Sequence, residues 1–100
     1  MGIDLTCDDI IRILKDEKPL LKERYHISSL GIFGSYVRED QLLESDLDLL
    51  VSFEDPPGLL KFIEMENYLS DLLGIKVDLV MRESLKSGIG ERILKEVVPV

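Results

Sequence analysis

Residues 28–53 read SSLGIFGSYVREDQLLESDLDLLVSF. The apolar run at Ser28–Phe33 ends at a glycine, and in the second run, Asp46–Phe53, the acids share one set of alternating positions. Both patterns predict short β-strands, because strand side chains point in turn to the two faces of a sheet. Between the strands, Gly34 and Ser35 favour a turn into a short helix that reaches about Arg38. This strand–helix–strand unit therefore decides the predicted fold.

Helices are predicted on both sides of this unit. Thr6-Cys7-Asp8-Asp9 resembles a capping box that starts a first helix. Pro19 disfavours a helix interior but suits a first turn, so we expect a second helix from there to about Tyr25. After the second strand, apolar residues recur at helical spacing over Leu59–Leu73, and Gly74 is a plausible helix end.

The remainder of the chain predicts a third strand and a final helix. Lys76–Met81 has the strand pattern, and Ser87 could cap a last helix that carries Ile89, Ile93, Leu94 and Val97 along one face. The apolar tail is expected to pack on its own core rather than to form an interface. The order of elements predicts one domain over residues 1–100, of the α/β (α+β) class, with a small mixed sheet flanked by helices.

Acids interrupt the apolar pattern of two strands. Asp46 and Asp48 share one strand face, and Asp78 occupies the corresponding face of the third strand. If these strands are neighbours, three carboxylates converge, and burying them without a cation is costly. Mg²⁺ prefers oxygen ligands, and two such ions suit phosphoryl and nucleotidyl chemistry. For the pair Asp46 and Asp48 alone the alternative is an exposed strand edge or the entry of a turn, and for Asp78 alone it is a solvated strand position.

The residues before these acids suggest a phosphate site. Gly34 would let a ligand approach the main chain, and N–H groups at the start of the short helix, with the Ser35 hydroxyl, could bind phosphate oxygens. Arg38 could reach an anionic group or pair with an acid such as Glu39. A glycine–serine pair alone also occurs in ordinary turns, but its spacing from Asp46 favours the functional interpretation.

Composition narrows the functional class. Hydrophobic residues make up 45% and charged residues 32% of the chain, which indicates a globular domain. No apolar run approaches the roughly 18 residues of a membrane span, and the acidic N-terminus is unlike a signal peptide. The net charge of −8 makes direct nucleic-acid binding unexpected; it suits a basic protein partner or simply keeps the protein dissolved. A single cysteine, Cys7, fits a cytoplasmic location.

The stretches at 31–38, 45–51 and 77–80 resemble the polymerase-β-type nucleotidyltransferase superfamily, in particular its minimal nucleotidyltransferase (MNT) branch. The resemblance implies that Gly34 and Ser35 contact a nucleoside triphosphate and that Asp46 and Asp48 bind metal. Asp78 would be the third acid, which completes the metal site or takes the proton of the attacking hydroxyl. One departure is that Glu39 and Asp40 follow Arg38, where a glycine is common.

MNT proteins of this size are typically antitoxins whose partner is a helical HEPN-type ribonuclease toxin. The resemblance therefore implies Mg²⁺-dependent transfer of AMP from ATP to a tyrosine of that toxin. Two other hypotheses stay open: an antitoxin that blocks its toxin by binding alone, and a transferase that acts on a small-molecule hydroxyl. The sequence does not identify which nucleotide is preferred.

Overall fold

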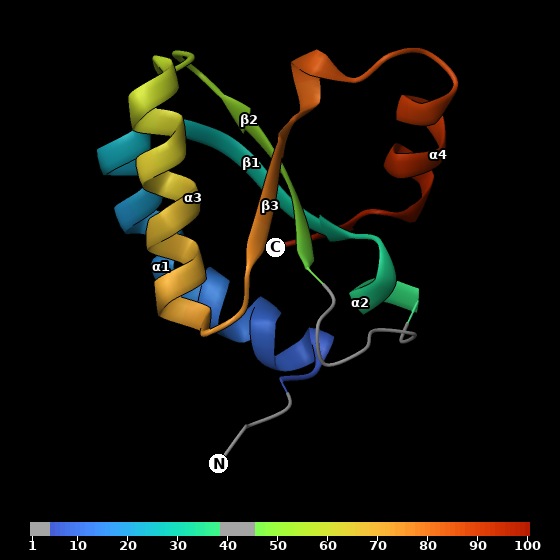
Figure 1. Cartoon of the computed structure of the whole chain (residues 1–100), viewed down its shortest axis with the longest axis horizontal. Helices are drawn as coiled ribbons and strands as arrows, with labels where there is room; N and C mark the ends of the chain where they lie inside the picture. Colours follow the sequence, from blue (N-terminus) through green and yellow to red (C-terminus); the bar gives the residue numbers. More distant parts are fainter. Residues whose placement is uncertain (1–4, 39–45) are drawn as a thin grey trace.

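The fold is built on a mixed sheet with helices on both sides (Figure 1). The computed structural model describes residues 5–38 and 46–100. Its elements, in chain order, are α1 (Cys7–Tyr25), β1 (Ile27–Phe33), α2 (Ser35–Arg38), β2 (Leu47–Phe53), α3 (Leu59–Leu73), β3 (Val77–Met81), the 3₁₀ helix η1 (Arg82–Ser84), α4 (Ile89–Glu96) and β4 (Val98–Pro99). The three predicted strands, the short helix and the helix ending at Gly74 are confirmed to within a residue or two.

In the described part of the chain the sheet has four strands, in the order β3-β2-β1-β4. β1 pairs antiparallel with β2 and with β4, whereas β2 and β3 run parallel. The sequence did not predict β4, a two-residue strand formed by the tail. Gly31 makes this pairing possible, because a Cβ there would lie 2.5 Å from the Val97 side chain. The expectation that the tail packs on its own domain is confirmed, since the Val100 N–H donates to the Leu30 carbonyl at 2.9 Å.

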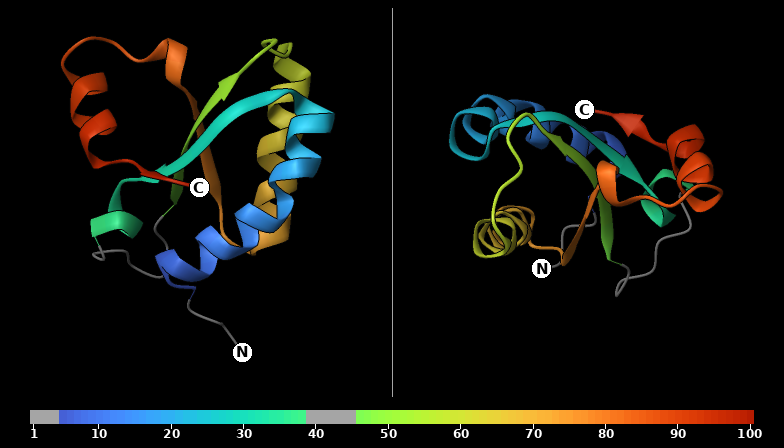
Figure 2. Two further views of the ribbon diagram at one scale, coloured as in Figure 1. Left: turned by 180° about the vertical axis from the view of Figure 1, so that it is seen from behind. Right: turned by 90° about the horizontal axis from the view of Figure 1, so that it is seen from above.

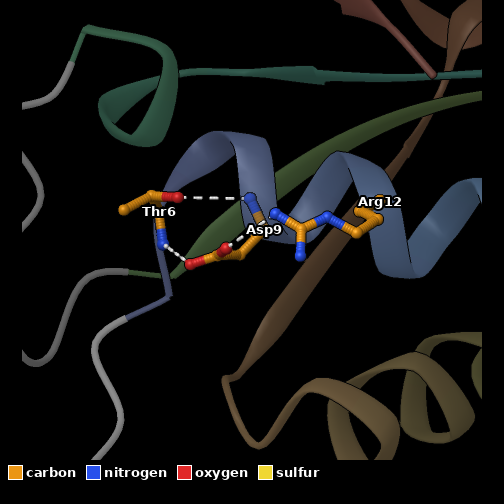
Figure 3. Close-up of polar contacts among 3 residues, drawn as sticks. All are labelled: Thr6, Asp9 and Arg12. Carbon is orange, nitrogen blue, oxygen red and sulfur yellow. Dashed lines mark hydrogen bonds and ion pairs between the residues drawn. The ribbon is translucent and has the colours of Figure 1, made fainter.

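The start of α1 follows the sequence prediction (Figure 3). The Asp9 N–H donates to the Thr6 hydroxyl at 3.2 Å, and the Thr6 N–H donates to the Asp9 carboxylate at 3.1 Å. These two bonds satisfy amides that the first turn of a helix leaves without partners. The bond from the Thr6 backbone is the largest cause that lowers the pKa of Asp9, and Arg12, 3.4 Å away, acts in the same direction.

The prediction of two N-terminal helices is wrong, because α1 continues unbroken through Pro19. An interior proline costs about 3 kcal/mol, since it removes a backbone bond and crowds the preceding turn. Ile10 and Leu14 before the proline and Leu21 and Tyr25 after it are all buried, and each such side chain contributes roughly 1.5–3 kcal/mol. Packing on both sides of Pro19 thus outweighs its local cost, and the ring itself lies exposed to solvent.

The main core lies between the sheet and the pair α1 and α3. The two helices lie on one side of the strands, and α4 lies on the other side in all three views (Figures 1 and 2). Buried residues of α3, namely Met65, Leu69 and Leu73, share this core with Leu47, Leu49 and Val51 of β2. β2 therefore turns its other face, which carries the acids, away from the main core.

The last helix differs from the prediction in two respects. Gly88, with φ of 94°, precedes α4, and among the described residues no side chain caps its start, so Ser87 does not have the predicted role. Ile89 is 66% exposed, Leu94 is 41% exposed, and Val97 lies beyond the helix end. The predicted helix is confirmed, but its four apolar residues do not form one buried face. The described parts of the chain contain no helix with the length and apolar character needed to cross a membrane.

Candidate active site

The two strands that carry the acids are neighbours, as convergence of the acids requires. In the parallel pair of β2 and β3, Asp48 is level with Asp78, and Leu47 is level with Val77. Asp46 immediately precedes β2, close enough for its charge to act on Asp48. The Lys76 ammonium lies 3.9 Å from the Asp46 carboxylate, but this ion pair is largely exposed and stabilises little. The fold thus brings the acids of positions 46, 48 and 78 to one side of the sheet.

The pKa of Asp48 is raised by its surroundings. Burial raises its pKa above the ordinary value, and the negative charges of Asp78 and Asp46 raise it further. Arg38 acts in the opposite direction and Glu96 adds a smaller upward effect. A half-buried carboxylate among other carboxylates holds charge at an energetic cost. Such a perturbation in a cleft is typical of functional sites.

Gly34 lies directly against the Asp48 carboxylate. A Cβ at position 34 would overlap the Asp48 carboxylate oxygen, and the backbone has φ of 83°, a left-handed conformation that favours glycine. The close approach follows from the register, since Phe33, the last residue of β1, pairs with Asp48. Ser35 begins α2 directly after this glycine, and the Gly34 carbonyl accepts bonds from Val37 and Arg38 at 3.1 and 3.2 Å. The predicted glycine–serine turn therefore lies directly beside Asp48.

A cleft of about 270 Å³ opens beside this site. One wall consists of Phe33, Gly34, Arg38 and Asp48. The other wall belongs to α4 and consists of Ile89, Arg92, Ile93 and Glu96, which we call the α4 wall. These four positions fall on one side of the helix, at spacings of three, four and seven residues. We refer to the whole space as the α4 cleft.

An ion pair joins the two walls of the α4 cleft. The Arg38 guanidinium donates to the Glu96 carboxylate at 2.7 Å, so α2 and α4 are linked across the cleft. The Arg38 side chain is 55% exposed and that of Glu96 26%, which leaves both within reach of solvent and ligand. The sequence suggested Glu39 as an acid partner of Arg38, but Glu39 and Asp40 lie outside the described residues. The observed partner comes from the far end of the chain.

The donor chemistry of the site suits Mg²⁺ in combination with a phosphate ligand. Among residues 5–38 and 46–100, no three acidic, histidine or cysteine side chains are close enough to hold an ion by themselves. Asp46, Asp48 and Asp78 nevertheless interact through their charges, and they offer the carboxylate oxygens that Mg²⁺ prefers. Mg²⁺ commonly uses one or two carboxylates and completes its shell with substrate phosphates. Gly34 and Asp48 both line the α4 cleft, which is open to such a substrate.

Comparison with known proteins identifies the family to which this chain belongs. The chain belongs to the nucleotidyltransferase domain family, whose sequence description matches residues 7–100. It is 54% identical over 96 residues to the protein adenylyltransferase MntA of Thermococcus cleftensis, covering 96% of this chain and 97% of that protein. The family resemblance stated from the sequence is thereby confirmed.

Two solved structures share the fold. A structure provisionally assigned as a minimal nucleotidyltransferase has a TM-score of 0.80 and 31% identity, and the match covers 99% of this chain and all of that one. A toxin–antitoxin crystal structure with AMP-PNP has a TM-score of 0.70 and 25% identity, and the match covers 95% of this chain and 72% of that one. The predicted mixed-sheet nucleotidyltransferase fold is therefore confirmed.

The α4 wall was not predicted from the sequence. The sequence pattern places Ile89 and Ile93 on one face of the last helix and gives no role to Arg92 or Glu96. A signal was present, since two charged residues alternate with two isoleucines on the same side of the helix. That pattern does not suit an apolar core, because a core-facing helix carries apolar residues at these spacings without charges among them. Only the path of the chain after β3 shows that this side faces Asp48.

Proposed function

We propose that this protein transfers AMP from ATP to a tyrosine hydroxyl of a partner HEPN-type toxin, with Mg²⁺ as cofactor, and thereby neutralises the toxin. The observation that carries the proposal is the register of Asp48 beside Asp78, with Gly34 packed against the Asp48 carboxylate. Family membership and the 54% identical adenylyltransferase support the chemistry. The net charge of −8 suits a basic protein partner.

Each site residue receives a role from its position. Asp46, Asp48 and Asp78 would hold two Mg²⁺ ions, which would neutralise phosphate charge and favour ionisation of the acceptor hydroxyl. Gly34 would let the triphosphate approach the main chain, and the Ser35 hydroxyl would donate to a phosphate oxygen. Arg38, now bonded to Glu96, would pair with a phosphate oxygen at the cleft wall. Asp78 would complete the metal site, take the proton of the acceptor hydroxyl, or do both.

The bond changes define the reaction. The tyrosine oxygen forms a bond to the α-phosphorus of ATP, and the bond from that phosphorus to the bridging oxygen of the β-phosphate breaks. Pyrophosphate leaves with the electron pair, and the phenolic proton passes to a carboxylate or to solvent. This chain's contribution is to hold the phosphates beside Asp48 and to align the acceptor with them, which lowers the entropic part of the barrier.

A protein acceptor is favoured over a small molecule by two observations. The solved toxin–antitoxin structure with AMP-PNP shares this fold. In addition, the first turn of α3 presents Leu59 and Leu60 to solvent, 74% and 85% exposed, which is apolar surface that a protein partner could cover. Turnover of a small-molecule hydroxyl without any protein partner would contradict this preference.

The proposal is tested with the purified chain, Mg²⁺, labelled ATP and the HEPN-type protein that accompanies it. We expect label on the partner, loss of the partner's ribonuclease activity, and neither effect with Asp46→Asn/Asp48→Asn. Asp16→Asn, which changes an exposed acid in the middle of α1, is the matched control and should behave as the unchanged chain. If the folded double variant still neutralises the partner, inhibition by binding alone is the correct function.

A further inference from the structure

The α4 wall has features that the fold itself does not require. Ile89 is 66% exposed, although it lies at the cleft that contains Asp48. An exposed isoleucine alone is ordinary, but this one is beside an exposed arginine, Arg92, on the same side of α4. No ion pair of Arg92 occurs in the described ranges 5–38 and 46–100. In a chain of net charge −8, a guanidinium with no acidic partner in those ranges is available for a ligand.

The geometry of the cleft restricts what this wall can contact. The proposed phosphate site at Gly34 and the carboxylate of Asp48 form the opposite wall. A nucleotide that has its phosphates there and also occupies this cleft would place its ribose and base against the surface opposite Asp48. The α4 wall is that surface across the cleft. The α4 cleft has a volume of about 270 Å³, near the lower end of the range for small-molecule sites. This volume suits the nucleoside part of one nucleotide.

We propose that the α4 wall is the nucleoside-binding surface, an inference that rests on the proposed function. Ile89 and Ile93 pack against the base or the ribose, and Arg92 stacks on the base or donates to a polar oxygen of the nucleotide. An apolar side chain beside a guanidinium matches a nucleobase, which has an apolar face and polar edges. Glu96 holds the wall in place through its bond to Arg38. Ile89, Ile93 and Arg92 thus contact the substrate, whereas Glu96 is a positioning residue.

The same helix provides matched controls. Leu94 is 41% exposed and Lys95 is exposed, but neither lines the α4 cleft. Ile89→Ala and Leu94→Ala each shorten an exposed aliphatic side chain, and Arg92→Ala and Lys95→Ala each remove an exposed positive charge. Because all four side chains are exposed, each variant should melt close to the unchanged chain. A difference in nucleotide binding between the two variants of a pair is then due to the position in the α4 cleft and not to the stability of α4.

The experiment measures the dissociation constant of AMP-PNP with Mg²⁺ by calorimetry, on the full chain without a partner. We expect Ile89→Ala and Arg92→Ala to weaken binding about tenfold each, consistent with loss of one buried contact, and the two controls to change it less than about twofold. Equal binding by all four variants overturns the inference. If the wall instead receives the partner's acceptor segment, nucleotide binding stays unchanged and the KM for the partner rises, which also overturns it.

The outcome separates this inference from the proposed function. If the chain binds AMP-PNP through Ile89 and Arg92 but never transfers AMP to a partner, the proposed function is refuted and nucleoside binding by the α4 wall is supported. Normal AMP transfer by the Ile89→Ala and Arg92→Ala variants would refute nucleoside binding by the α4 wall and would leave the proposed function intact. A chain that binds no AMP-PNP at all refutes both.

Discussion

Asp48 lies level with Asp78 on the adjacent parallel strand, and the charge of Asp78 contributes to the raised pKa of Asp48. The arrangement is costly for the protein without a bound cation, because burial and like charges both oppose ionisation of Asp48. The cost is consistent with a site built for a cation and a phosphate ligand rather than for stability. Stability and activity should therefore respond in opposite directions to changes at this position.

The first prediction concerns the stability of Asp48→Asn in the absence of metal. Folding raises the pKa of Asp48 above its ordinary value of 3.8. At pH values between 3.8 and the raised pKa, the folded state therefore binds more protons than the unfolded chain. Stability therefore falls as pH rises through that interval. The variant lacks this loss and should melt a few degrees above the unchanged chain at neutral pH, with the gap closing as pH falls to 3.8.

Thermal melts at several pH values in the presence of a chelator check this expectation. Asp16→Asn, at an exposed position of α1, should follow the unchanged chain throughout. A lower melting temperature for Asp48→Asn at neutral pH would show that the carboxylate stabilises the fold. That result would contradict the claim that the ionised Asp48 destabilises the metal-free protein.

A second prediction uses two glycines with left-handed backbones. Gly34 has φ of 83° and Gly74 has φ of 68°, but only at Gly34 would a Cβ meet the Asp48 carboxylate; at Gly74 no atom lies within 4 Å. Both alanine substitutions should cost about 1–2 kcal/mol of stability from backbone strain. Gly34→Ala should also lower kcat/KM on the order of a hundredfold, because it displaces a carboxylate of the site.

Urea unfolding and single-turnover assays on the two variants separate these effects. Gly74→Ala should keep near-normal activity despite its strain. If Gly34→Ala is as active as Gly74→Ala, the close approach at Asp48 has no role in catalysis.

The third prediction concerns Asp78, which is exposed on β3 and level with Asp48. Asp78→Asn should lower kcat on the order of a thousandfold, since loss of several kcal/mol of charge stabilisation corresponds to that factor. Binding of Mn²⁺ together with AMP-PNP, followed by electron paramagnetic resonance, distinguishes the two roles that remain open. Lost Mn²⁺ binding identifies a metal ligand, whereas normal binding with activity that recovers at higher pH identifies a proton acceptor. Normal activity would exclude both roles.

The fourth prediction concerns the bond between Arg38 and Glu96, 2.7 Å long and shared by the two walls of the α4 cleft. Glu96→Gln should raise the KM for ATP several-fold and change kcat less, because the variant loosens the wall without altering the carboxylates. Glu91→Gln, an exposed acid in the first turn of α4, is the control. The partly exposed pair contributes little to stability, so both variants should unfold at similar urea concentrations. Identical KM values for the two variants would remove Glu96 from the positioning role.

The sequence predicted the half of the site that depends on local patterns. Asp48 lies in a strand whose alternation is visible in the sequence, Asp46 immediately precedes that strand, and Gly34 marks the end of the preceding one. The pairing of Asp48 with Asp78 needed only the assumption that the second and third strands are neighbours, which the structure confirms. Short-range periodicity was sufficient here because the turn and the strands are continuous in sequence.

Features that depend on tertiary packing were not predictable in this way. Pro19 favours a helix start locally, but burial of residues on both sides of it keeps α1 continuous. Ile89 has the spacing of a core residue, and only the return of the chain over the acidic face of β2 makes it part of the α4 cleft. The ion pair of Arg38 with Glu96 joins residues 58 positions apart, beyond the reach of any local pattern.

The most direct test of adenylyl transfer compares ATP labelled at the α-phosphorus with ATP labelled at the γ-phosphorus, using this chain, Mg²⁺ and its HEPN-type partner. We predict that the α-label appears on a tyrosine of the partner while the γ-label leaves with pyrophosphate, and that Asp46→Asn/Asp48→Asn abolishes the transfer. Transfer of the γ-label to the partner, or α-label transfer that persists in the folded double variant, would contradict adenylyl transfer at this carboxylate site.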